Sequence, residues 1–80
     1  MASAHELRTA TLGRMTDAIA KELNECLFAI VLNSSTCLRM LSADAPNVEE
    51  GRETARRTIR SSNRAAEAVS RLRPLCTEKK

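Results

Sequence analysis

The sequence predicts an all-α fold, and three observations support this. The apolar content is 42% while aromatic residues make up only 1%, so the apolar side chains are small and aliphatic. Two glycines and two prolines are too few for a turn-rich β protein. Apolar residues instead recur at steps of three and four, which is the helical period. We therefore expect one small domain over residues 1–80, an antiparallel two-helix hairpin that forms a homodimeric four-helix bundle.

The first predicted helix covers residues 5–42. A single apolar seam follows it for about eight turns at helical spacing. Its members are Leu12, Met15, Ile19, Leu23, Leu27, Ile30, Cys37 and Leu41, with Ser34 in one slot. Gly13 weakens the helix without ending it. The alternative is a break near Gly13, which would give an irregular three-helix monomer.

A turn over residues 43–47 separates the two helices. Pro46 forbids a continuing helix, and Asn47 is a predicted N-cap with Glu50 three residues later. The second helix is expected over residues 48–73, because the approach to Pro74 disfavours helical backbone. Its seam is weaker and consists of Val48, Ala55, Ile59, Ser62, Ala66, Val69 and Leu72.

Dimerisation is predicted from the width of these seams. Long helices joined by about five residues lie antiparallel, and one hairpin then offers only one interface. A chain of this size also buries little surface by itself. Two hairpins packed together cover both seams. The predicted dimer core is Ile19, Leu23, Leu27, Ile30, Cys37, Leu41, Ala55, Ile59, Ala66 and Val69.

The three cysteines do not indicate a metal site or a disulfide framework. Cys26, Cys37 and Cys76 are an odd number without CxxC spacing or a nearby histidine. They are typical of small, mostly buried thiols in a reducing compartment. No apolar run approaches the roughly 20 residues of a membrane span, and the first residues lack a secretion signal. We expect a cytoplasmic segment without membrane contact and without a metal.

One segment resembles a known family. Residues 19–27 read Ile-Ala-Lys-Glu-Leu-Asn-Glu-Cys-Leu, which is similar to the H box of bacterial sensor histidine kinases, Ile-Ala-His-Glu-Leu-Asn-Gln-Pro-Leu. The resemblance continues through Ala29-Ile30-Val31, Pro46-Asn47 at the hairpin turn and Asn63-Arg64-Ala65. It therefore covers nearly the whole chain and implies the dimerisation and phosphoacceptor domain of that family.

The resemblance fails at the residue that carries the chemistry. In the family, the box histidine accepts a phosphoryl group from ATP and passes it to a receiver aspartate, but this chain has Lys21 there. Helical geometry points Lys21 away from the seam, toward solvent. An imidazole is largely neutral at pH 7, whereas an exposed lysine amine is almost entirely protonated and lacks a free lone pair. We expect no phosphoacceptor activity at Lys21, and His5 lies over four turns upstream.

Neighbouring positions also depart from the family. Glu22 occupies the position at which the family has an acidic residue that assists phosphotransfer from the histidine. Because the histidine is missing here, we expect Glu22 to be an exposed helix charge near Lys21. Glu25 stands where family phosphatase activity relies on an amide or hydroxyl, so that activity is not expected. Cys26 replaces a proline, which predicts a straighter helix. These changes favour a natural substitution at Lys21 over the alternative, an engineered one.

The remaining predicted function is binding. Phe28 and Leu32 lie one turn apart on the same side as Lys21, which predicts a docking patch made of Lys21, Glu22, Glu25, Phe28 and Leu32. The resemblance implies a response-regulator receiver domain as the partner. The alternative is that dimer packing covers Phe28 and Leu32. Together with the resemblance, the sequence thus predicts a pseudokinase-type dimerisation module that docks a receiver without phosphorylating it.

The competing class is a nucleic-acid-binding protein. Residues 1–50 carry four basic and seven acidic groups, whereas residues 51–80 carry nine basic and three acidic groups. Arg56, Arg60 and Arg64 align at four-residue spacing, as phosphate contacts require. No DNA-binding motif and no stacking aromatic accompanies them, which disfavours this alternative. The chain also lacks ATP-binding motifs, so a cofactor is expected only if an ATP-binding domain follows in a longer parent protein.

Overall fold

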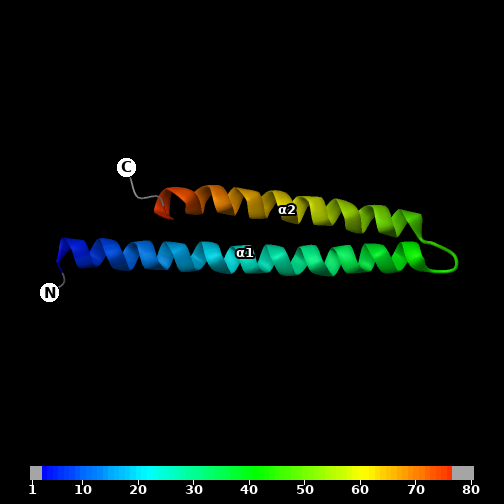
Figure 1. The fold of residues 1–80 in the computed structure, drawn as a ribbon, viewed down its shortest axis with the longest axis horizontal. Coiled ribbons are helices and arrows are strands. Elements are labelled where there is room, and N and C mark those ends of the chain that lie inside the picture. The colour runs from blue at the N-terminus through cyan, green and yellow to red at the C-terminus, as the bar shows by residue number, and fades with distance from the viewer. Residues whose placement is uncertain (1–2, 77–80) are drawn as a thin grey trace.

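The computed structural model describes residues 3–76, which form two helices lying side by side in opposite directions (Figure 1). Helix α1 spans Ala4–Ser42 and helix α2 spans Val48–Cys76. The molecule is a rod with extents of 65 × 27 × 13 Å. The predicted all-α helical hairpin is confirmed.

Helix α1 begins with a complete capping box. The Ser3 hydroxyl accepts a hydrogen bond from the Glu6 backbone N–H at 3.1 Å, and the Glu6 carboxylate accepts one from the Ser3 N–H at 2.9 Å. From there α1 continues through Gly13 and Cys26 to Ser42 without interruption (Figure 1). The alternative with a break near Gly13 is therefore wrong.

The turn between the helices is closed by Asn47. Its backbone N–H donates to the carbonyl of Met40 at 2.9 Å, and its side-chain oxygen accepts from the N–H of Glu50 at 3.0 Å. Asn47 thus satisfies one of the backbone donors that the start of a helix leaves without a partner. The predicted N-cap is confirmed.

Helix α2 does not end at residue 73, as the sequence predicted, but continues to Cys76 with Pro74 inside it. A proline in the last turn removes one intrahelical hydrogen bond, and its fixed φ is still compatible with a helix. Leu72 and Leu75 are half-buried, so packing of this last turn outweighs the lost bond.

The contact between the helices uses small side chains from α2. Thr54, Ser61 and Ala68 of α2 are buried, as are Ile19 and Cys26 of α1. The buried Thr54 hydroxyl donates to the carbonyls of Glu50 and Gly51, both at 3.0 Å, so it keeps hydrogen-bond partners. Small residues at this spacing let the two backbones approach closely.

Gly51 marks the closest approach near the turn. A Cβ atom at this position would lie 2.9 Å from Cδ2 of Leu41, so the absence of a side chain lets Leu41 pack on the α2 backbone. The thiol of Cys37 donates to the carbonyl of Gly51 at 3.2 Å. Cys26 and Cys37 are free thiols, and the side chain of Cys76 lies outside the described residues.

Most of the predicted seam of the second helix does not face α1, since only Ala55 and Leu72 of it are half-buried. Its other large side chains stay exposed: Val48 by 50%, Ile59 by 59% and Val69 by 43%. The reason is that the residues of α2 that are buried against α1 lie on a different side of the helix. Together with exposed leucines of α1, Val48, Ile59 and Val69 form an apolar face on one side of the hairpin. We define the apolar face as Leu27, Leu38, Leu41, Val48, Ile59 and Val69. Part of it is a groove of about 400 Å³ lined by Ser34, Cys37, Leu38, Leu41, Ala55, Thr58 and Ile59.

Within one chain the predicted dimer core is only partly covered. Ile19 is buried, and Leu23, Ile30, Cys37 and Ala55 are half-buried. The exposed members are Leu27, Leu41, Ile59, Ala66 and Val69. Their burial in a dimer stays a prediction.

The N-terminal part of α1 extends beyond the end of α2 (Figure 1). Leu7 and Leu12 in this segment are 59% and 44% exposed. Across residues 3–76, neither helix combines the length and apolar character needed to cross a membrane.

Candidate functional site

The middle of α1 presents four predicted site residues on one side. Lys21, Glu25, Phe28 and Leu32 follow one another at steps of four, three and four, and all are exposed. Phe28 is 71% and Leu32 is 54% exposed. The buried Cys26 lies five residues after Lys21, about 140° around the helix. These four residues, which we call the outer strip, therefore point away from α2.

Lys21 offers charge rather than nucleophilic chemistry. Its side chain is exposed, and no carboxylate within residues 3–76 forms an ion pair with it. An amine in water is protonated at neutral pH and has no lone pair with which to attack a phosphoryl group. The described residues also contain no cluster of side chains able to hold a metal ion. Lys21 thus offers one exposed cation, with the carboxylate of Glu25 one turn away in the same strip.

Glu22 does not behave as the sequence predicted. It was expected to be an exposed charge beside Lys21, but its side chain is only 30% exposed and forms an ion pair with Arg71 of α2. Consecutive helical residues point about 100° apart, so Glu22 turns toward α2 while Lys21 turns to solvent. The ion pair joins the two helices at the residue next to Lys21.

Arg71 was not among the predicted docking residues, although it pairs with one of them, Glu22. With Glu22 it borders a groove of about 310 Å³ whose other lining residues are Met15, Ala18 and Ile19. The Arg71 side chain is 46% exposed, so it combines an apolar contact with a charge still reached by solvent. Its partner is 49 positions away in the sequence, and no local pattern indicates such a pairing.

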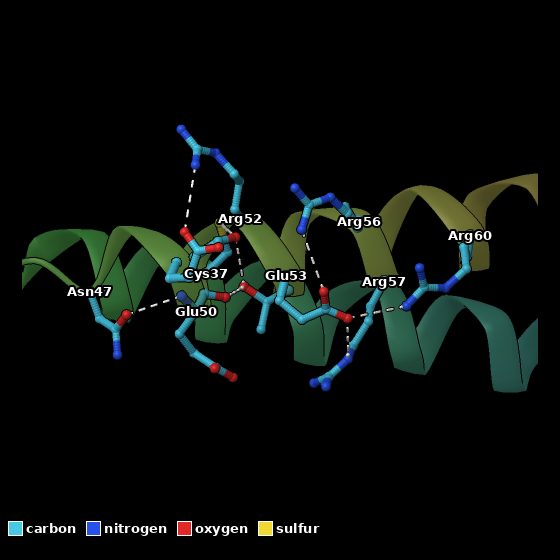
Figure 2. A network of polar contacts seen from close by, with 11 residues as sticks. Cys37, Asn47, Glu50, Arg52, Glu53, Arg56, Arg57 and Arg60 are labelled. Carbon is cyan, nitrogen blue, oxygen red and sulfur yellow. Dashed lines mark hydrogen bonds and ion pairs between the residues drawn. The ribbon is translucent and has the colours of Figure 1, made fainter.

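The other arginines of α2 pair mainly within their own helix. Figure 2 shows the Glu53 carboxylate with Arg56, Arg57 and Arg60 around it. Each of the three arginines forms an ion pair with Glu53, with an N–O distance of 3.5 Å. Arg52 reaches Glu49 at 3.6 Å. Because one carboxylate is shared by three guanidinium groups, the surface stays basic. These three arginines are nevertheless paired with a carboxylate of their own helix. This arrangement gives no specific support to the nucleic-acid alternative, which stays a prediction.

Comparison with known proteins shows a similarity to a sensor histidine kinase. Over 66 residues the chain is 38% identical to the sensor histidine kinase TmoS of Ectopseudomonas mendocina. The match covers 82% of this chain but only 7% of that kinase. No protein-family model and no solved structure matches the chain significantly. The similarity supports a histidine-kinase-related segment with a role in histidine-kinase-like signalling.

Proposed function

We propose that the chain is the dimerisation and receiver-docking module of a histidine-kinase-like signalling protein, and that it binds its receiver without accepting a phosphoryl group. The observation that carries the proposal is the exposed Lys21 at the acceptor position of an uninterrupted α1. The relationship to a sensor histidine kinase supplies the signalling context.

Dimerisation follows from the apolar face. Ile59, Leu27 and Leu41 are 59%, 54% and 47% exposed in the single hairpin. A contiguous apolar surface of this kind marks an interface, and burying one such side chain contributes roughly 1.5–3 kcal/mol. A second copy presents the same surface, so a two-fold arrangement covers both faces at once. The result is the four-helix bundle that the sequence predicted.

The loss of phosphoacceptor function has two causes. A lysine stands in place of the imidazole nucleophile, and the adjacent Glu22 is paired with Arg71 and is not free to assist a proton transfer. His5 does not replace the missing histidine, because sixteen residues of helix place it roughly 24 Å from Lys21 along the axis.

Docking follows from the outer strip. The strip is turned away from α2, and Phe28 lies about 100° around α1 from Leu27 of the apolar face, so a dimer formed through that face leaves Phe28 open. An exposed aromatic ring next to a charged residue is typical of an interaction anchor. The acidic phosphorylation pocket of a receiver is complementary to Lys21, which gives attraction and register.

The test is binding of purified, unphosphorylated receiver domains of the source organism to the immobilised hairpin, measured as a panel. We expect one receiver to bind, with its affinity reduced about tenfold by Lys21→Glu and by Phe28→Ala. Asn63→Ala on the exposed surface of α2 is the matched control and should bind as the wild type does. Absence of binding to every receiver, or equal binding by all variants, would contradict the proposal.

A second arm tests the chemistry. The wild-type chain is incubated with the phosphorylated form of the receiver, and the chain is then analysed by intact mass. We expect no added phosphoryl group. A phosphorylated Lys21 would show that the amine is activated in a way that its exposure does not support.

A further inference from the structure

We propose that Arg71 is a second cationic contact for the receiver, reaching from α2 to the flank of the outer strip, and that Glu22 holds it in position before the receiver arrives. This inference rests on the proposed function, because it adds a residue from the other helix to the same docking site. Sequence reasoning placed every docking residue on α1.

The position of Arg71 is fixed by its contact with α1. Its Nη2 donates to a Glu22 carboxylate oxygen, whereas Arg56, Arg57 and Arg60 pair with Glu53 inside α2. Arg71 therefore places a positive charge from the arginine-rich helix α2 next to helix α1. It does so at the residue next to Lys21.

Arg71 retains hydrogen-bond donors for an acidic partner. Lys21 and Arg71 carry two positive charges against the carboxylates of Glu22 and Glu25, so Arg71 offsets the second carboxylate near Lys21. A guanidinium has five N–H donors, and the bond from Nη2 to Glu22 leaves others for a second carboxylate. Arg71 can thus bridge Glu22 and an aspartate of the receiver pocket without leaving its place.

Positioning in advance lowers the cost of binding. The groove formed with Met15, Ala18 and Ile19 supports the aliphatic part of Arg71, and Glu22 fixes the guanidinium. A long side chain that is already ordered loses less conformational entropy when the partner arrives. Lys21, which has no such support among the described residues, provides attraction but less geometric precision.

Two substitutions distinguish this role from a purely structural one. If the ion pair only holds the helices together, Arg71→Gln and Glu22→Gln both replace it by a weaker hydrogen bond, and both should weaken binding. If Arg71 contacts the receiver, the effects differ. Arg71→Gln removes a cation that the acidic pocket needs, whereas Glu22→Gln removes a negative charge that repels the pocket and keeps an oxygen that accepts from Arg71.

The experiment measures the dissociation constant of the receiver that binds the wild-type dimer, at several salt concentrations. We expect Arg71→Gln to weaken binding by roughly three- to tenfold and to reduce its salt dependence, with Arg71→Lys in between. Glu22→Gln should bind as tightly as the wild type or more tightly. Asn63→Ala serves as the matched surface control, and circular dichroism verifies that each variant is folded.

Three results would overturn the inference. Unchanged binding by Arg71→Gln, while Lys21→Glu still weakens it, would refute the role of Arg71 alone and leave the proposed function intact. Equal losses from Arg71→Gln and Glu22→Gln would assign the pair a structural role. A wild-type dimer that binds no receiver would refute the proposed function and this inference with it.

Discussion

The close approach of the helices at Gly51 gives a prediction whose magnitude follows from the structure. An alanine in place of glycine inside a helix stabilises it by about 0.5–1 kcal/mol, because glycine loses more backbone freedom on folding. At Gly13 nothing lies within 4 Å of an added Cβ, so Gly13→Ala should show this gain. At Gly51 the added Cβ would meet Leu41 Cδ2 at 2.9 Å and Leu41 Cγ at 3.2 Å.

The contact with Leu41 should cancel the gain at Gly51. Leu41 is 47% exposed, so it can turn outward, but leaving its rotamer costs about 0.5–1.5 kcal/mol. The net effect of Gly51→Ala therefore lies between a gain of about 0.5 kcal/mol and a loss of about 1 kcal/mol. Removing the obstacle changes the result, since in a Leu41→Ala background the same substitution should stabilise by about 0.5–1 kcal/mol.

Urea denaturation followed by circular dichroism measures these differences at a fixed chain concentration, because dimerisation makes stability concentration-dependent. The four chains of the Gly51 and Leu41 cycle give the coupling energy directly, and Gly13→Ala is the control without a steric contact. If Gly51→Ala stabilises equally with Leu41 and with alanine at residue 41, the helices do not approach closely there.

Three further predictions test other parts of the structure. Cys26→Pro should cost about 3 kcal/mol in urea denaturation because it interrupts the continuous α1, against about 1 kcal/mol for Cys26→Ala; equal costs would contradict a continuous helix. Ile59→Asp on the apolar face should raise the dimer dissociation constant at least about tenfold by analytical ultracentrifugation, and an equal effect of Ser35→Asp, at an exposed residue outside that face, would argue against the interface. Glu53→Gln removes three exposed ion pairs and should lower stability by less than about 1 kcal/mol, with a loss that shrinks at high salt; a salt-independent loss would point to another cause.

Much of the fold was predictable because its signals are local. The helical spacing of apolar residues, Pro46 and the Asn47 cap predicted two helices and the turn between them. The start of α1 was also predictable, because Ser3 followed by Glu6 is the sequence pattern of a capping box. The end of α2 was predicted too early, because packing of Leu72 and Leu75 offsets the local effect of Pro74.

The lateral arrangement was less predictable because it depends on contacts between distant residues. The large side chains of the predicted α2 seam, such as Ile59 and Val69, are exposed. The residues of α2 that are buried are the small ones, Thr54, Ser61 and Ala68. Small side chains give a weak hydrophobic signal, although they permit the closest approach. The pairing of Glu22 with Arg71 likewise depends on how the helices are rotated relative to each other, which single-helix periodicity does not specify.

The central claim is that the apolar face of this hairpin is covered by a second copy, which creates the module on which a receiver docks. The most direct test is the molar mass of the purified chain by light scattering across a dilution series. The account predicts twice the chain mass of 8.8 kDa, persisting on dilution. A well-folded monomer at every concentration would contradict it, because the apolar face would then be stable in water and the bundle would not exist.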